Sequence, residues 1–129
     1  MKYVEPLKNK DDINKISNYF KEQHLRNYLL FTLGINTPMR VSQLLNLRVI
    51  DVKDKEEITI MIGKKVILFP LGSKVKEIIQ DYCKNKSDRD FLFTSTRVKN
   101  NLKPITESQV NKILVKASIN CDINNLGAS

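Results

Sequence analysis

The sequence has no tryptophan, a single histidine and only two cysteines among its 129 residues. Cys83 and Cys121 match no metal-ligand spacing, and we expect reduced, buried side chains rather than a disulfide. No apolar run approaches the roughly 20 residues that a membrane-spanning helix needs. The stretch from Met1 to Pro6 has no apolar core typical of a secretion signal. We therefore expect a cytoplasmic protein that uses no metal and no small-molecule cofactor and contacts no membrane.

Tyrosine and histidine, which serve as nucleophiles and proton-transfer groups, do not occur after Tyr82. The single histidine, His24, lies in a helical pattern, and we predict a structural role for it. Tyr19, Tyr28 and Tyr82 fit apolar helix faces and are predicted to be core residues. The last third of the chain therefore offers neither a histidine base nor a tyrosine nucleophile.

Positive charge is what the chain has in excess. Its 22 lysine and arginine residues stand against 14 aspartate and glutamate residues, which gives a net charge of +8. A chain of this length forms one domain that buries roughly two-thirds of its unfolded surface. Such a charge on a small domain favours a polyanionic partner, with nucleic acid first, although a solvated lysine-rich surface accounts for the charge equally well.

Hydrophobic periodicity predicts three helices in the first half of the chain. The first has apolar residues at helical spacing over residues 13–20, and the second runs from about residue 25 to residue 33. A turn over residues 36–38 leads to a short third helix whose leucines point inward. The predicted boundaries are Asp11 or Asp12 as the first N-cap, Gly34 as the end of the second helix and Ser42 as the third N-cap.

The hydrophobic period changes to two in the middle of the chain. A strand over residues 57–62 places alternate isoleucines on one face. Gly63-Lys64 suits a two-residue type II′ turn, which favours glycine at its first position. The partner strand is predicted over residues 65–69 and ends at Pro70. These residues therefore predict a β-hairpin.

Two further helices are predicted after the hairpin. Ser73 is the predicted cap of the first, and residues 91–93 form a short buried segment between the two. Thr106 and Gln109 form a capping box for the last helix, whose hydrophobic staple joins Ile105 to Val110. Three helices, a β-hairpin and two further helices make a mostly α-helical α+β domain, and we expect residues 1–129 to form a single domain.

Two segments of this pattern resemble the tyrosine recombinases, or phage integrases. Residues 29–52 resemble the first conserved box of the family, in which an apolar helix, a turn and an arginine precede Ser-acid-Leu-Leu. Residues 60–71 resemble the second strand pair of the catalytic domain, which has a lysine at its hairpin turn. Residues 91–93 and the helix from Thr106 resemble further segments more weakly. The resemblance spans essentially the whole chain and implies the front part of a recombinase catalytic domain.

The resemblance implies an enzyme that cuts and rejoins double-stranded DNA at specific sites through a phosphotyrosine intermediate. In that reaction the non-bridging phosphate oxygens gain charge, which forked guanidinium groups match well. Arg40 is then the phosphate-binding arginine, and Lys64 is the general acid for the leaving oxygen. Lys65 is the alternative for the lysine role and otherwise a DNA contact. Other candidate DNA contacts lie in a basic loop, Arg97, Lys99 and Lys103, for which a solvated surface loop is the alternative.

The sequence also departs from the family pattern. Pro38 stands where the family has a glycine two residues before the arginine, and proline fixes φ and removes an amide donor. Gln43 stands where the family has an acidic residue, so it can hydrogen-bond but cannot pair as a charge. The His-x-x-Arg box and the nucleophilic tyrosine, which follow a segment like residues 126–129, are missing. We expect residues 1–129 to be an incomplete catalytic domain that binds DNA, with other recombinase protomers as candidate partners, and does not cleave DNA alone.

Two alternatives remain open at this point. One is a winged helix-turn-helix regulator without catalytic activity, in which residues 41–48 form the recognition helix and the hairpin forms the wing. Against it stand the short, leucine-rich helix and a turn longer than three or four residues. The other is a naturally truncated relative that binds DNA or a full-length partner and exposes apolar surface.

Overall fold

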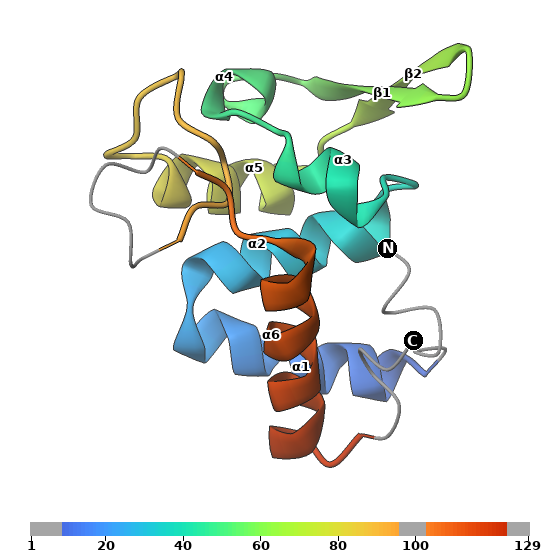
Figure 1. The fold of residues 1–129 in the computed structure, drawn as a ribbon, viewed down its shortest axis with the longest axis vertical. Coiled ribbons are helices and arrows are strands. Elements are labelled where there is room, and N and C mark those ends of the chain that lie inside the picture. The colour runs from blue at the N-terminus through green and yellow to red at the C-terminus, as the bar shows by residue number, and fades with distance from the viewer. Residues whose placement is uncertain (1–8, 96–102, 124–129) are drawn as a thin grey trace.

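The computed structural model describes residues 9–95 and 103–123, and Figure 1 shows helices packed around one central helix, with a β-hairpin projecting at one end. The predicted class, a mostly helical α+β fold, is confirmed. One short helix, α4, was not predicted, so four helices precede the hairpin in the described part of the chain. The elements are α1 (Lys10–Gln23), α2 (Leu25–Asn36), α3 (Val41–Leu45), α4 (Val49–Val52), β1 (Glu57–Ile62), β2 (Lys65–Pro70), α5 (Ser73–Tyr82) and α6 (Glu107–Asn120).

The hairpin has the predicted turn and register. β1 and β2 pair antiparallel, with Ile62 opposite Lys65 at the closing pair. Gly63 has a φ of +61°, a left-handed value that favours glycine over residues with a side chain. Gly63 and Lys64 therefore form the two-residue turn that the sequence predicts.

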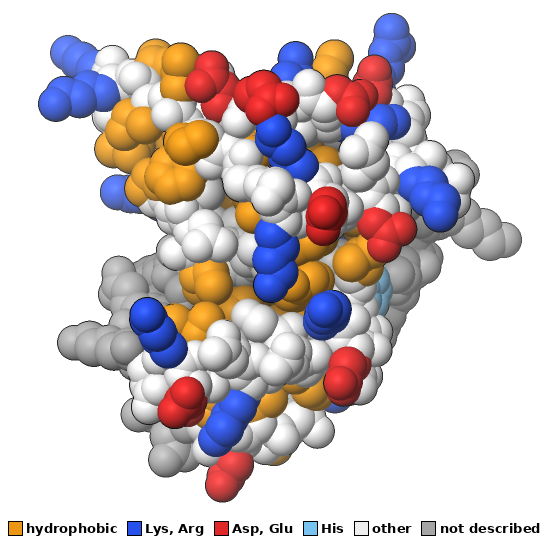
Figure 2. Space-filling model, turned by 180° about the vertical axis from the view of Figure 1, so that it is seen from behind, with side chains coloured by type: hydrophobic (Ala, Val, Ile, Leu, Met, Phe, Trp, Pro, Cys, Tyr) orange, Lys and Arg blue, Asp and Glu red, His pale blue; other side chains and the backbone are white. Residues whose placement is uncertain are grey.

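The two faces of the hairpin differ in burial. On the inner face, Ile58 and Ile60 are fully buried as predicted, whereas Ile62 is 41% exposed because it lies beyond the edge of the core. The outer face of the hairpin is exposed, and it carries the apolar side chains of Met61, Val66 and Leu68 beside the polar Thr59. Figure 2, seen from behind, shows hydrophobic side chains gathered at this end of the molecule, with lysine or arginine side chains beyond them.

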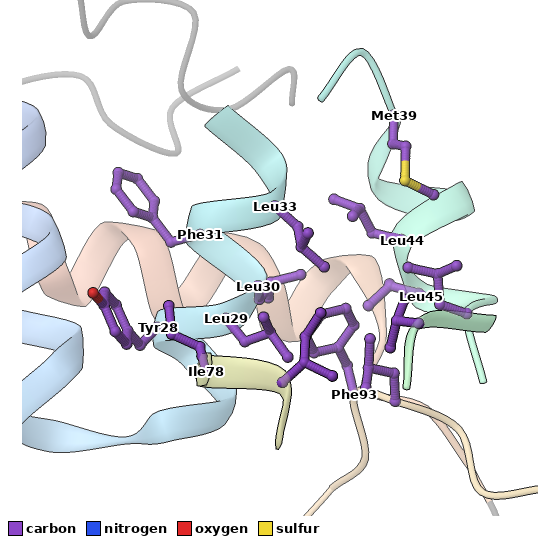
Figure 3. Close-up of a cluster of buried hydrophobic side chains, with 14 of the residues drawn as sticks. Tyr28, Leu29, Leu30, Phe31, Leu33, Met39, Leu44, Leu45, Ile78 and Phe93 are labelled. Carbon is purple, nitrogen blue, oxygen red and sulfur yellow. The ribbon is translucent and has the colours of Figure 1, made fainter. Parts of the chain in front are cut away.

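The core forms around α2, which other elements surround. Its buried residues run through consecutive positions rather than along one stripe, as expected for a helix enclosed on several sides. The Phe31 ring lies 5.5 Å from the Phe20 ring of α1. Figure 3 shows Leu29 and Leu30 of α2 close to Phe93, with the α3 leucines Leu44 and Leu45 on the other side of Phe93. The helices predicted to be amphipathic therefore direct their apolar faces to one cluster.

The first two helix boundaries differ from the predicted ones. Asn9, not Asp11 or Asp12, caps α1, because its side-chain oxygen accepts the Asp11 N–H at 2.8 Å. α2 does not end at Gly34 but continues to Asn36. Pro38 sets this end, because a residue before proline is driven to extended backbone, and Thr37 has φ −128° and ψ 157°.

The caps of α3 and α5 each lie one or two residues before the predicted position. Arg40, not Ser42, is the N-cap of α3, and Gln43 at the third helical position accepts the Arg40 N–H at 2.8 Å. Gly72, not Ser73, is the N-cap of α5. For α6 the predicted capping box is confirmed, since Thr106 Oγ1 accepts the Gln109 N–H at 3.1 Å and Gln109 Oε1 accepts the Thr106 N–H at 2.8 Å.

The unpredicted helix α4 depends on contacts distant in the sequence. The backbone N–H of Val49 donates to Asp90 O at 2.9 Å, and the Leu92 N–H donates to Leu47 O at 2.8 Å. The guanidinium of Arg48 lies 4.1 Å from the centre of the Phe91 ring. Residues 91–93 therefore form the buried segment that the sequence predicts, with Phe91 half-buried at its edge.

Cys83 and most tyrosines are core residues, as predicted. Cys83 and Cys121 are both free thiols, but only Cys83 is fully buried, whereas Cys121 is half-buried at the edge of the core. Tyr28 is buried, and Tyr19 and Tyr82 pack against the core. Tyr3 lies outside the described residues.

Candidate nucleic-acid interface

Arg40 lies at the junction between α2 and α3. Its neighbours Met39 and Val41 are each only 4% exposed, so their burial fixes the backbone on both sides of Arg40. The Arg40 N–H donates to Gln43, and the Arg40 carbonyl accepts the Leu44 N–H at 3.0 Å. The Arg40 side chain itself is exposed, and in the described part of the chain no carboxylate forms an ion pair with it. The fold therefore presents a free guanidinium on a fixed backbone.

Lys64 and Lys65 lie at the tip of the hairpin, and both are exposed. Lys64 belongs to the turn itself, while Lys65 is the first residue of β2 and pairs with Ile62. Lys64, which the sequence predicts in the turn, is therefore the lysine that the structure has there. Its ammonium group reaches solvent at the furthest point of the hairpin from the core.

The side chain of Gln43 joins the start of α3, where Arg40 lies, to the hairpin. Its Oε1 accepts the Arg40 N–H, and its Nε2 donates to the Met61 carbonyl of β1 at 2.7 Å. Gln43 and Met61 line a groove of about 670 Å³ between β1 and the helices α3 and α4. In the sequence, Gln43 stands where the family pattern has an acidic residue. A glutamine three residues after a helix cap is nevertheless a capping-box signal that would have found its first bond.

Of the predicted basic loop, only Lys103 lies among the described residues. Arg97 and Lys99 lie outside the described residues. Lys103 is exposed, next to Pro104, which bridges Thr94. Within the described ranges, no hydrogen bond or ion pair joins Lys103 to Arg40 or to the hairpin.

The side chains of Arg26, Lys86 and Tyr82 bond to the segment that leads to this loop, and of these three Tyr82 is the one predicted from the sequence as a core residue. Arg26, only 9% exposed, donates from Nη1 to the Thr94 carbonyl at 2.9 Å, and burial lowers the pKa of its guanidinium. Lys86 donates to Thr94 Oγ1 at 3.2 Å. The Tyr82 hydroxyl donates to the Leu92 carbonyl at 2.6 Å. These residues stabilise the segment structurally.

His24 is structural, as predicted. It is the N-cap of α2, and its Nδ1 accepts the Arg26 N–H at 3.2 Å. Burial, followed by the nearby Arg26 charge, lowers the pKa of His24, which keeps the imidazole neutral and able to accept this bond. Its position in the α1–α2 junction separates it from the α3 surface.

Among the described residues no three histidine, cysteine or acidic side chains are grouped closely enough to bind a metal ion. None of the helices in residues 9–95 and 103–123 has the length and apolar character needed to cross a membrane.

In the described residues, the segment that the winged helix-turn-helix alternative needs as a recognition helix is too short for that role. The helix predicted over residues 41–48 ends at Leu45, and three of its five residues, Val41, Leu44 and Leu45, are buried. A helix that short, with its apolar face in the core, leaves few side chains to read base edges in a major groove.

Comparison with known proteins identifies relatives along nearly the whole chain. The profile of the "Phage integrase family" matches residues 8–128. A probable integrase/recombinase of Bacillus subtilis strain 168, YoeC, is 31% identical over 129 residues, which cover 98% of this chain and 70% of that protein. Tyrosine recombinase XerC of Caldanaerobacter subterraneus is 32% identical over 102 residues, which cover 75% of this chain but only 28% of that protein.

A solved structure supports the fold. The crystal structure of XerA recombinase superposes with a TM-score of 0.74 over 92% of this chain and 44% of that chain, at 19% sequence identity. At this identity the similarity concerns the arrangement of helices and hairpin. The chain thus spans less than half of the XerC and XerA polypeptides.

Proposed function

Since this chain belongs to the phage integrase family, we propose that it binds double-stranded DNA as part of a site-specific tyrosine recombinase. The observation that carries this proposal is the exposed Arg40 on a fixed backbone, joined through Gln43 to the strand that leads to Lys64. The net charge of +8 favours the approach of this domain to a polyanion.

In the proposed reaction, a tyrosine hydroxyl loses its proton to water and attacks a backbone phosphorus of DNA. A phosphotyrosyl bond forms, the bond from phosphorus to the 5′ oxygen breaks, and that oxygen needs a proton. Arg40 donates hydrogen bonds to the non-bridging oxygens, which gain charge as phosphorus becomes five-coordinate. Lys64 provides the proton, because an ammonium group at the hairpin tip can reach outward from the core. Lys65 and Lys103 contact neighbouring phosphates. Arg97 and Lys99, outside the described residues, are proposed for the same role.

We expect Arg40→Ala to weaken binding to duplex DNA about tenfold at low salt, because one charge-assisted contact to phosphate is lost. The loss is equal on unrelated sequences, and the slope of log K against log salt falls by about 1. Fluorescence anisotropy with a labelled duplex over a salt series measures both quantities.

Arg89→Ala is the matched control. It removes the same charge from another exposed arginine, one that lies on the loop between α5 and residues 91–93. Equal affinities for the two variants would mean that Arg40 acts only through net charge and would contradict the proposal.

We also expect these 129 residues alone to form no covalent adduct with DNA. Tyr28 is buried, Tyr82 donates its hydroxyl to the Leu92 carbonyl, and Tyr19 packs against the core, so none presents a free hydroxyl beside Arg40. Incubation with a nicked suicide duplex followed by denaturing electrophoresis gives the test. A slow-migrating adduct that maps to any of the chain's tyrosines would show the expectation to be wrong.

A further inference from the structure

We propose that Gln43 is a positioning residue that holds the lysine hairpin at a fixed place relative to Arg40. This inference rests on the proposed function, because it concerns the geometry of the two cations that contact DNA. Its basis is that one side chain makes two hydrogen bonds, to Arg40 at 2.8 Å and to Met61 at 2.7 Å.

The chemistry of the two partners fixes the orientation of the Gln43 amide. A backbone N–H can only donate and a backbone carbonyl can only accept, so the oxygen must face Arg40 and the nitrogen must face Met61. A glutamate at this position could accept the Arg40 N–H, but it would place an anion beside the Met61 carbonyl. The hairpin bond therefore requires the amide, and Gln43 does something here that an acidic residue at the same position cannot do.

The Met61 carbonyl is available because of the hairpin register. Ile62 and Lys65 close the two-residue turn as a hydrogen-bonded pair, so the alternation of an antiparallel ladder makes Met61 and Val66 a non-hydrogen-bonded pair. The Met61 carbonyl consequently points away from β2, along the free edge of β1. Gln43 donates a hydrogen bond to the Met61 carbonyl on that edge, where solvent would otherwise be the hydrogen-bond partner.

The bond lies where core packing ends. Ile60 is 1% exposed, whereas Met61 is 52% exposed and every later residue up to Val66 is exposed. In the described part of the chain, no other hydrogen bond from outside the hairpin reaches β1 beyond Ile60. A two-stranded ribbon without further support is only marginally stable. The Gln43 bond is therefore the last attachment before Lys64, which follows Met61 by three residues.

The consequence is a fixed placement of the hairpin strand that leads to Lys64 relative to the backbone of Arg40. When the bond is present, the two cations engage phosphates of one duplex without first ordering the hairpin. When the bond is absent, the strand ends become ordered only on binding, and the entropy lost in that step makes the free energy of binding through Lys64 less favourable. Gln43 therefore increases the contribution of Lys64 to DNA binding, although it contacts no DNA itself.

The test compares Gln43→Glu with Ser42→Glu. Both add one negative charge to the exposed side of α3, but only Gln43→Glu removes the donor to Met61. We expect amide hydrogen exchange at Ile62 and Lys65 to become about tenfold faster in Gln43→Glu, as for the loss of one hydrogen bond, and to stay unchanged in Ser42→Glu.

The second measurement is the effect of Lys64→Ala on DNA affinity in each background. We expect about a tenfold loss in the wild type and in Ser42→Glu, and less than a twofold loss in Gln43→Glu. A merely structural role would lower affinity without changing the effect of Lys64→Ala. Should Gln43→Glu fail to melt cooperatively, Gln43→Met, which is uncharged and of similar length, replaces it.

The outcomes separate the two proposals. Unchanged exchange in Gln43→Glu, or an undiminished effect of Lys64→Ala in that background, overturns the positioning role even if Arg40→Ala weakens DNA binding. If neither Arg40→Ala nor Lys64→Ala alters affinity in the wild type, the proposed DNA contacts are wrong, and the positioning role is overturned with them, whatever the exchange rates show.

Discussion

A Phe93→Ala variant is expected to lose about 3–5 kcal/mol of unfolding free energy, which is a large part of the stability of a domain of this size. Phe93 has no exposed surface and lies among α2 and α3 leucines in Figure 3. Its carbonyl also accepts the Ile105 N–H at 2.9 Å, so it joins the buried segment to the start of α6. Truncation leaves a cavity where three parts of the chain meet, and rigid helices on two sides limit its collapse.

Urea unfolding followed by circular dichroism measures this loss. Leu68→Ala is the control, because Leu68 is 56% exposed on the outer face of the hairpin. Its expected change is within about 0.5 kcal/mol, as for most surface substitutions. A Phe93→Ala variant that unfolds at the same urea concentration as Leu68→Ala would contradict the described core.

The second large effect is a loss of stability at alkaline pH that depends on Tyr82. Burial is the main cause that raises the pKa of Tyr82 to about 12, from about 10 for an unperturbed tyrosine. The folded state therefore holds the phenolic proton more tightly than the unfolded state. The resulting stabilisation is complete below pH 10 and is lost as the pH rises from about 10 to about 12, by about 2–3 kcal/mol.

Tyr82→Phe isolates this contribution. It keeps the ring and removes the hydroxyl that donates to the Leu92 carbonyl, at an expected cost of about 1 kcal/mol near neutral pH. Burial also raises the pKa of the Cys83 thiol, and a charge on Cys83 raises the pKa of Tyr82, so the pH dependence of the difference includes the interaction of the two groups. The difference in unfolding free energy between wild type and Tyr82→Phe must shrink or reverse between pH 10 and pH 12. A constant difference across that range would show that Tyr82 ionises equally easily in both states.

The sequence predicted elements whose signals are local. The capping box of α6 needs only Thr106 and Gln109, three residues apart, and it forms with the expected bonds. The hairpin turn needs only a glycine that tolerates positive φ between two alternating apolar strands. The resemblance to the tyrosine recombinases indicates Arg40 and Lys64 as candidates, and both side chains are exposed in the structure.

Features set by distant residues could not be predicted in this way. α4 has four residues, too few for a period, and its first N–H bonds to Asp90, some forty residues later. Arg26 bonds to the Thr94 carbonyl, and nothing near Arg26 in the sequence indicates that partner. α2 continues past Gly34 because glycine only permits a helix to end, whereas Pro38 drives the backbone of Thr37 to the extended region. The bond from Gln43 to Met61 has no local signal, since Met61 lies across the groove on β1.

The pairing of Leu47 with Leu92 also bears on how the domain forms during synthesis. Phe93 lies beside the α3 leucines Leu44 and Leu45, so the chain between them must close as one loop before that part of the core is complete. A growing chain that has released only α1 to the hairpin lacks Phe93. We expect the backbone around Arg40 to become ordered only after residue 93 has left the ribosome.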